Sequence, residues 1–245
     1  MKRTYEMAQL RRPPNRLTPA EYTMYNLKGL SWEKKSQFLG ANSSTAISAN
    51  NDPHSQTLTR DKLLTYSILC FHRLPFPDIK AVGHPMRGFP GAHSLGSAKE
   101  IARYLENEAD FPLFMKPIAG NAGAGSIWVE GFAEGLLHLR NGKTMVLDDY
   151  FNRWLSRDGI LLQAAAHPHP EIALRFGPRL ATARVVVLMS DSGPIVHRAV
   201  LRIPTGTNMI DNFQHGASGN LLGSIEVDTG VISNVIGKKD RRLET

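Results

Sequence analysis

The chain has 245 residues, of which 42% are hydrophobic, and a formal net charge of +7. This apolar content excludes a chain that is disordered throughout, and it is enough for one large core or two small ones. The positive charge favours anionic partners such as nucleotides, phosphosugars, nucleic acid or a membrane surface, without choosing among them.

The single cysteine, Cys70, excludes an internal disulfide framework and any metal site built from several cysteines, as expected in a reducing compartment. It lies in the apolar run LLTYSILCF, where we expect a small buried core residue. The apolar runs are shorter than the ~20 residues of a transmembrane helix, and none follows the basic amino end as in a secretory signal. We therefore expect a cytoplasmic protein. An organellar transit peptide is the alternative, which Glu6, Pro13 and Pro14 disfavour.

The amino-terminal part is predicted to be helical and small. Residues Thr18 to Glu21 form a capping box with proline at the first helical position, which predicts a helix from Pro19 to about Leu27. A second helix is expected over SWEKKSQFLG, residues 31–40. The serine, asparagine and proline content of residues 41–55 indicates a loop or linker.

Two further helices are predicted before residue 110. Apolar residues recur at helical spacing over residues 60–72, and prolines close that segment. The glycine- and proline-rich residues 82–96 are expected to form a connection. A second capping box, Ser97 to Glu100, opens a helix that should stop before Asp110.

Short strands dominate beyond Phe111, with one helix over LDDYFNRWL. Asp191-Ser192-Gly193 and Asp228-Thr229-Gly230 lie between apolar runs as hairpin turns do, so at least four strands should pair antiparallel. Regular βαβ alternation is absent, and the pattern therefore predicts an α+β fold. The strand runs are PLFMKP, SIWVEGF, GILLQAA, ATARVVVLMS, PIVHRAVLRIP, GSIEVD and GVISNVI.

The sharpest local feature is an apolar strand that contains one lysine, Lys116, and leads into a glycine-rich loop. A lysine within a strand is costly unless its amine meets an anion, and glycines let backbone N–H groups approach phosphate oxygens. The following strand would complete a β-hairpin lid. This is not a Walker A loop, because no Gly-Lys-Ser/Thr opens a helix. A flexible hairpin with an edge lysine is the alternative. The loop residues proposed to bind nucleotide are Gly120, Gly123, Gly125 and Ser126.

Together with other segments, this strand and loop resemble the ATP-grasp proteins, and most closely the sugar-transfer associated ATP-grasp family. The resemblance covers roughly residues 61–232 and depends on the order of the pieces more than on any single one. These pieces are DKLLTYSILCFHRLPFP, FPLFMKPIAGNAGAGSIWV, ILLQAAAHPHPEIA, LATARVVVLMSD and AVLRIPTGTNMIDNFQHGASGNLLGSIEVDTGVI. It implies two α+β subdomains whose antiparallel sheets flank a nucleotide cleft, after a helical amino-terminal region.

The resemblance also implies site residues. Lys62 and Lys116 match the two nucleotide-facing lysines, and Gln163 lies at the hinge that holds adenine. Arg184 and Arg202 match positively charged residues that face the phosphates or the second substrate. Asp211 and Asn212 match the DN pair that follows the second of these arginines. Each has an ordinary alternative: a solvated helix residue for Lys62, a hydrogen-bonding strand end for Gln163, and the partner of an acidic residue for Arg184.

The family's usual reaction implies ATP and Mg²⁺. A substrate carboxylate attacks the γ-phosphate, and a nucleophile such as an amine displaces the acylphosphate formed. Asp211 is the candidate metal ligand, with Asp228 also considered. Two departures bear on catalysis. His215-Gly216-Ala217-Ser218 replaces a glycine pair, and the sequence ends at Thr245 before the strands that usually carry the acidic and asparagine magnesium ligands. We expect a fragment, a protein that binds nucleotide without efficient turnover, or an unusual residue set.

The expected function is an ATP-dependent ligase in polysaccharide or sugar-transfer biosynthesis, acting on a small-molecule or saccharide-linked substrate, although the sequence leaves open whether it is an enzyme. The alternative is a non-catalytic nucleotide-binding or scaffold protein of the same fold. A basic nucleic-acid-binding module is disfavoured because aromatic residues do not interleave the basic ones. A metal role for His167 and His169 is disfavoured, because no further donors are adjacent in sequence. They are expected at a strand-to-helix turn and in contact near the ribose. The expected parts are residues 1–58, 59–110, 111–160 and 161–245.

Overall fold

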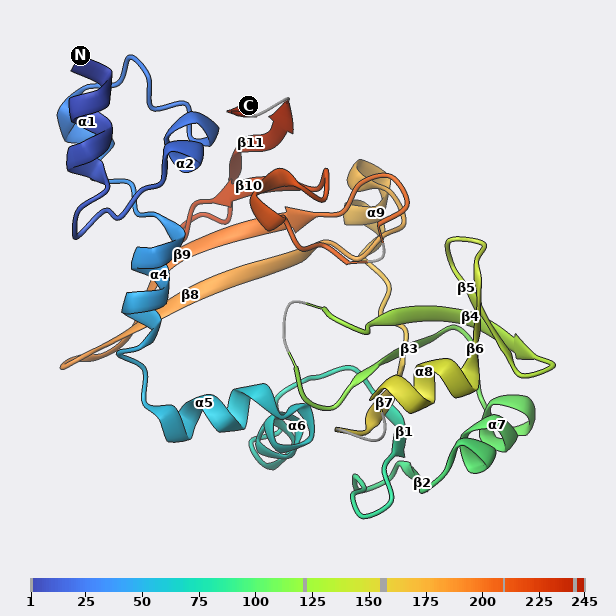
Figure 1. Ribbon diagram of the computed structural model, residues 1–245. Coiled ribbons are helices and arrows are strands. Elements are labelled where there is room, and N and C mark those ends of the chain that lie inside the picture. Colours follow the sequence, from blue (N-terminus) through green and yellow to red (C-terminus); the bar gives the residue numbers. More distant parts are fainter. Residues whose placement is uncertain (1, 121–122, 155–157, 209, 240–241, 245) are drawn as a thin grey trace. The chain divides into compact units, whose positions relative to one another are not determined.

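The computed structural model describes residues 2–120, 123–154, 158–208, 210–239 and 242–244 (Figure 1). The chain forms two compact units. Unit 1 comprises Met1–Ser55, Thr182–Ile203 and Phe213–Thr245, and unit 2 comprises Gln56–Ala181 and Pro204–Asn212. The predicted α+β class is confirmed, because helices accompany a sheet in each unit. The predicted division into four parts stays a prediction, and its boundary at residue 160 falls within a strand of unit 2.

Unit 2 is built on a mixed sheet. The described strands follow the order β2-β1-β7-β3-β4-β5-β6, with β1 and β2 parallel and the other neighbours antiparallel. The strands are β1 (Ile79–Gly83), β2 (His93–Leu95), β3 (Leu113–Pro117), β4 (Ile127–Ala133), β5 (Leu136–Leu139), β6 (Thr144–Val146) and β7 (Ile160–Ala164). The helices are α5 (Pro53–Arg60), which begins in unit 1, α6 (Lys62–Phe71), α7 (Ala98–Asn107), α8 (Leu147–Trp154) and α9 (Pro170–Phe176).

The two faces of this sheet carry separate apolar clusters. One contains Leu113 and Met115 of β3 with residues of α7 and α8, such as Ile101 and Tyr150. The other contains Leu63 of α6 with residues of β1 and β7. Residues of a strand alternate between the two faces of a sheet. Since Leu113 and Met115 face α7 and α8, the residues next to them in β3 face α6. Lys116 therefore lies on the face that α6 covers only in part.

Unit 1 is built on an antiparallel sheet. Its described strands follow the order β12-β11-β10-β9-β8. Both predicted hairpin turns are confirmed, one between β8 and β9 and one between β10 and β11. The elements are α1 (Lys2–Leu10), α2 (Pro19–Met24), α3 (Trp32–Ser36), α4 (Ala41–Ser48), β8 (Thr182–Ser190), β9 (Gly193–Ile203), the 3-10 turn η1 (Gln214–Gly216), β10 (Leu221–Ile225), β11 (Ile232–Lys239) and β12 (Arg242–Glu244).

The predicted capping box at Thr18 is confirmed, and it does more than begin a helix. The Glu21 carboxylate accepts from the Thr18 backbone N–H and hydroxyl, both at 2.8 Å, and from the Ala41 N–H at 2.7 Å. Burial alone would raise the pKa of Glu21, but these hydrogen bonds outweigh it and the pKa is lowered. One ionised carboxylate thus joins the starts of α2 and α4.

Residues 41–55, predicted as a loop or linker, contain α4 and the start of α5 instead. Local hydrogen bonds explain the difference. Asp52 accepts from the Ser55 N–H at 2.8 Å, and Pro53 is the first residue of α5. Residues that are common in loops are also good helix starters, so the composition misled the prediction.

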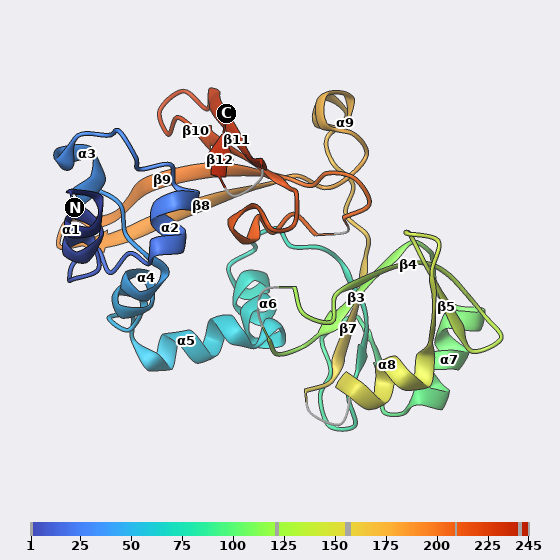
Figure 2. The same ribbon diagram turned by 45° about the horizontal axis from the view of Figure 1, so that its top comes forward.

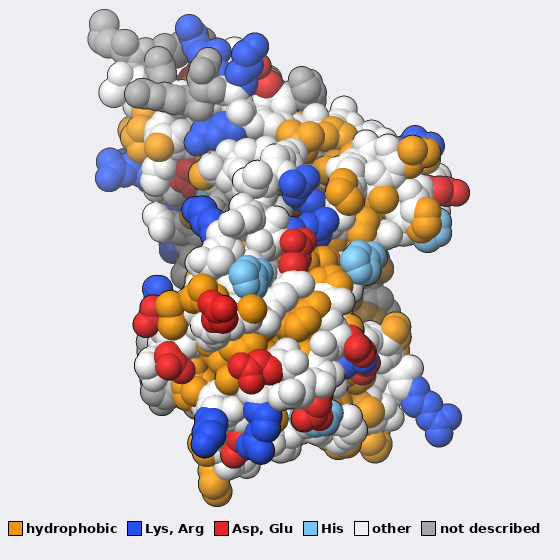
Figure 3. Space-filling model, turned by 90° about the vertical axis from the view of Figure 1, so that its right-hand side faces the viewer, with side chains coloured by type: hydrophobic (Ala, Val, Ile, Leu, Met, Phe, Trp, Pro, Cys, Tyr) orange, Lys and Arg blue, Asp and Glu red, His pale blue; other side chains and the backbone are white. Residues whose placement is uncertain are grey.

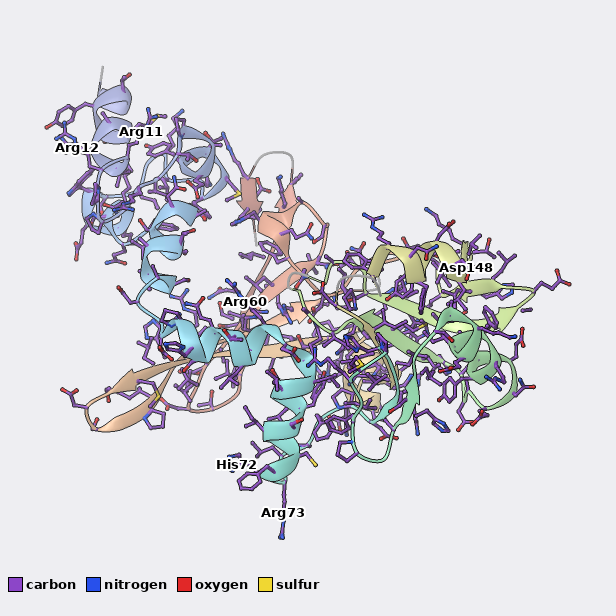
Figure 4. The ribbon with its side chains drawn as sticks, turned by 60° about the horizontal axis from the view of Figure 1, so that its bottom comes forward. Arg11, Arg12, Arg60, His72, Arg73 and Asp148 are labelled. Carbon is purple, nitrogen blue, oxygen red and sulfur yellow. The ribbon has the colours of Figure 1, made fainter. Side chains whose placement is uncertain are left out.

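Cys70 is exposed, so the prediction of a buried core residue was wrong. The helix α6 is apolar on most sides, and Leu63 is its only described residue that is fully buried. The apolar side chains therefore exceed what the sheet can cover. At the end of α6, Phe71 is 82% exposed, and the neighbouring His72 and Arg73 extend from the helix end (Figure 4).

The hairpin of β8 and β9 is also rich in exposed apolar side chains, among them Val185, Leu188 and Ile195. Figure 2 shows β8 and β9 as a long ribbon. Apolar side chains reach the surface between charged ones on the face shown in Figure 3. In the part of the chain that the structure describes, no helix is both long enough and apolar enough to cross a membrane.

Candidate nucleotide site

Lys116 lies on an inner strand, as predicted, because β3 pairs with β7 on one side and β4 on the other. Its amine donates to the hydroxyl of Tyr66 at 2.9 Å. The amine is also 5.3 Å from the ring centroid of Tyr66 and 5.7 Å from that of Phe114. Among the described residues, no carboxylate forms an ion pair with it. A half-buried ammonium group is thus held by a neutral hydroxyl and aromatic rings.

Lys62 is fixed beside the end of the same strand. Asp61 caps α6 by accepting from the Leu64 N–H at 3.1 Å, and the guanidinium of Arg87 lies 2.8 Å from that carboxylate. The backbone N–H of Lys62 donates to the Ile118 carbonyl at 3.0 Å. Its amine donates to the same carbonyl at 3.3 Å and to the Gly120 carbonyl at 3.2 Å. The first turn of α6 is therefore held against the start of the glycine-rich loop.

The two lysines act on each other electrostatically. Burial lowers the pKa of Lys62, and the positive charge of Lys116 lowers it further, while Asp61 and Asp158 oppose these effects. Burial and the nearby like charge of Lys116 thus both disfavour the charged form of Lys62. An anion between them would remove this penalty.

The glycine-rich loop has the backbone conformations that require glycine. Gly120, Gly123 and Gly125 have φ values of 119°, 75° and 71°. The loop is tied to α8, because the hydroxyl of Tyr150 donates to the Gly125 carbonyl at 2.9 Å. The Ser126 N–H donates to the Gly123 carbonyl at 3.1 Å. The side chain of Ser126, and not its backbone N–H, is therefore the candidate contact to the nucleotide. Residues 121 and 122 lie outside the described part.

Gln163 is almost fully buried, with 1% of its surface exposed. Its side-chain amide donates to the Pro77 carbonyl at 3.1 Å, and it stands opposite Phe114 in the sheet. The strand β7 is therefore fixed at the position where the predicted hinge begins. Its role in holding adenine stays a prediction.

The other candidate residues are divided between the units. Asn212 lies beside the glycine-rich loop, since a Cβ added to Gly123 would come within 3.3 Å of its side-chain nitrogen. Asp211 precedes it in unit 2. Arg184 of β8 and Arg202 of β9 belong to unit 1, where Arg202 donates to the Thr182 hydroxyl at 2.9 Å. The structure thus brings Lys62, Lys116 and the loop together, and the catalytic roles of the arginines stay predictions.

Most of the chain matches the sequence model of a known family. Residues 42–243 match the sequence model of the family described as sugar-transfer associated ATP-grasp. The chain belongs to this family. No curated protein and no solved structure matches the chain significantly. The ATP-grasp fold predicted from the sequence is confirmed, and with it a sugar-related context for this ATP-grasp protein.

Magnesium has no assembled protein site in the described part of this ATP-grasp protein, where no three His, Cys, Asp or Glu side chains come together as ligands. Asp211 alone would not satisfy a hard cation, which takes several oxygen ligands. Its role as a metal ligand stays a prediction, and we assign no reaction step to the metal.

Sequence reasoning missed Tyr66 and Arg87. Tyr66 follows Lys62 by four residues, so the two share a helix face, and this spacing was a usable signal. Arg87 is 26 residues from Asp61, and nothing in the sequence connects the two. Tyr66 and Arg87, which the prediction overlooked, thus support the lysines from outside the glycine-rich segment.

Proposed function

We propose that this ATP-grasp protein binds ATP in unit 2, with the phosphates against Lys62, Lys116 and the glycine-rich loop. The observation that carries the proposal is the pair of mutually repelling ammonium groups for which the described residues provide no carboxylate ion pair. A triphosphate supplies the missing negative charge, and charge-assisted hydrogen bonds to it replace those that the amines now make to neutral oxygens.

The remaining contacts follow from this placement. Backbone N–H groups of Gly120, Gly123 and Gly125 approach the phosphates, with the Ser126 hydroxyl as a further donor. Gln163 orients the strand end at which adenine is held. Because Lys62 donates to the Gly120 carbonyl in the structure, the arrival of phosphate exchanges that bond for a stronger one and frees the loop to close.

We further propose that the protein is an ATP-dependent ligase acting on a saccharide-linked or small carboxylate. An oxygen of the carboxylate attacks the γ-phosphorus, the bond from this phosphorus to the bridging oxygen breaks, and ADP leaves. An amine then attacks the acyl carbon and releases phosphate. Asn212, whose side chain lies beside the glycine-rich loop, stabilises the charge of the transferring group, and the catalytic roles of Arg184 and Arg202 stay predictions. Magnesium, when bound with ATP, neutralises phosphate charge.

Hydroxylamine trapping tests the ligase proposal. The protein is incubated with ATP, magnesium, hydroxylamine and a panel of uronic acids and other sugar-linked carboxylates. An acylphosphate reacts with hydroxylamine, so a true substrate should give ADP and hydroxamate in equal amounts. The non-catalytic alternative gives ATP binding with no carboxylate-dependent ADP, and that result across the panel would contradict the ligase proposal.

A further inference from the structure

A basic cavity lies in unit 2, lined by residues that have no part in the proposed ATP site. Its volume is about 50 Å³. It is bounded by β4, the turn after β5, the segment after α9 and the loop after β9. Its polar lining residues are Trp128, Arg140, Asn141, Arg179, Thr207 and Asn208.

The first sign of a ligand is Trp128. Only 7% of this residue is exposed, and its indole nitrogen is buried without a hydrogen-bond partner in the part of the chain that the structure describes. An indole N–H can only donate, and leaving a buried donor unpaired is unfavourable. Such a group needs a hydrogen-bond acceptor, which the described residues do not provide.

The second sign is the charge of the lining. The Arg140 guanidinium lies 4.4 Å from the centroid of the Trp128 ring and donates to the Pro178 carbonyl at 3.3 Å. Arg179 lines the same cavity. No carboxylate of the described residues forms an ion pair with either arginine. Two guanidinium groups and an indole N–H offer donors only, so the complementary group is a negatively charged acceptor.

We propose that this cavity binds a single oxyanion group, a carboxylate or a phosphoryl group, through Arg140, Arg179 and the Trp128 N–H. The size supports one such group, because pockets that hold a whole small molecule begin at about 300 Å³. The rest of the ligand would extend out of the cavity. None of the cavity's lining residues is among those proposed to bind ATP, and the inference does not rest on the proposed function.

The test follows the indole N–H signal of Trp128 by nitrogen-15 NMR, assigned with Trp128→Phe, during titration with inorganic phosphate and, separately, with acetate. We expect the Trp128 signal to move with at least one of the two anions, and Trp32 to stay unchanged. Phosphate could also meet the lysines, so the titrations are repeated in Lys116→Ala, where the Trp128 shift should persist. A shift with phosphate alone identifies a phosphoryl group, and a shift with acetate alone a carboxylate.

Substitutions of the arginines test whether these side chains bind the anion. Arg179→Gln should weaken binding of the anion at least about tenfold, because a hydrogen bond to a charged group is lost. Arg175→Gln is the matched control, because Arg175 is exposed on α9 and does not line the cavity. If Arg179→Gln does not fold, Arg179→Lys, which keeps the charge and loses the fork, is measured instead. No shift with either anion, or equal weakening in Arg175→Gln, overturns the proposal.

Discussion

Replacing Lys116 by alanine is expected to weaken ATP binding by roughly tenfold to a hundredfold, because a hydrogen bond to a charged group contributes about 1.5–3 kcal/mol and each 1.4 kcal/mol is tenfold. The Lys116 amine has no ion-pair partner among the described residues. It can therefore donate to a phosphate without breaking an ion pair. The neutral bond to Tyr66 is the contact exchanged. Isothermal titration calorimetry with ATP measures the affinity of both proteins.

The matched control is Lys80→Ala. Lys80 belongs to β1 of the same sheet, but its amine already lies 2.6 Å from the carboxylate of Asp78. This substitution removes the same charge and the same number of atoms without touching the proposed site. ATP affinity should be nearly unchanged, and an equal loss in the two variants would mean that the overall charge, and not Lys116, governs binding.

The second large effect is expected for Gly125→Ala, which should destabilise the protein by about 2–5 kcal/mol. A Cβ at this position would lie 2.5 Å and 2.6 Å from ring atoms of Trp154 and 2.8 Å from Pro117. Overpacking costs about 1–3 kcal/mol, and a left-handed φ, here 71°, adds about 1–2 kcal/mol for a residue with a side chain. Urea unfolding gives the difference in the free energy of unfolding.

Gly135→Ala separates these two contributions. Gly135 has a φ of 75°, and a Cβ added there would meet nothing within 4 Å. It should therefore show only the conformational cost of about 1–2 kcal/mol. Equal losses at Gly125 and Gly135 would show that the glycine-rich loop does not pack on Trp154 as the structure has it.

The sequence predicted what depends on local chemistry. The two Asp-x-Gly turns gave the hairpins of unit 1, and the run PLFMKP gave the strand that carries Lys116. Capping side chains marked the start of α2 correctly, because the helix-starting hydrogen bonds join residues three apart. The resemblance supplied the fold, which local patterns could only assign to the α+β class.

Contacts between residues far apart in the chain could not be predicted from the sequence. The strand β7 pairs with both β1 and β3, and neither pairing follows from the turn residues near it. The exposure of Cys70 depends on which side of an almost wholly apolar helix the sheet covers. The support of Lys62 by Gly120, 58 residues away, likewise exists only in the folded chain. The glycine-rich loop and Lys116 were accessible to sequence reasoning, whereas the contacts that hold them were not.

Protection of lysine amines by ATP tests most directly whether the two lysines meet the phosphates. The lowered pKa of Lys62 leaves more of its reactive neutral amine, so brief acetylation followed by peptide mass spectrometry should modify it readily in the free protein. Saturating ATP should reduce modification of Lys62 and Lys116 and leave the exposed Lys143 unchanged. Undiminished modification of Lys62 and Lys116 under saturating ATP, or an equal reduction at Lys143, would contradict the account.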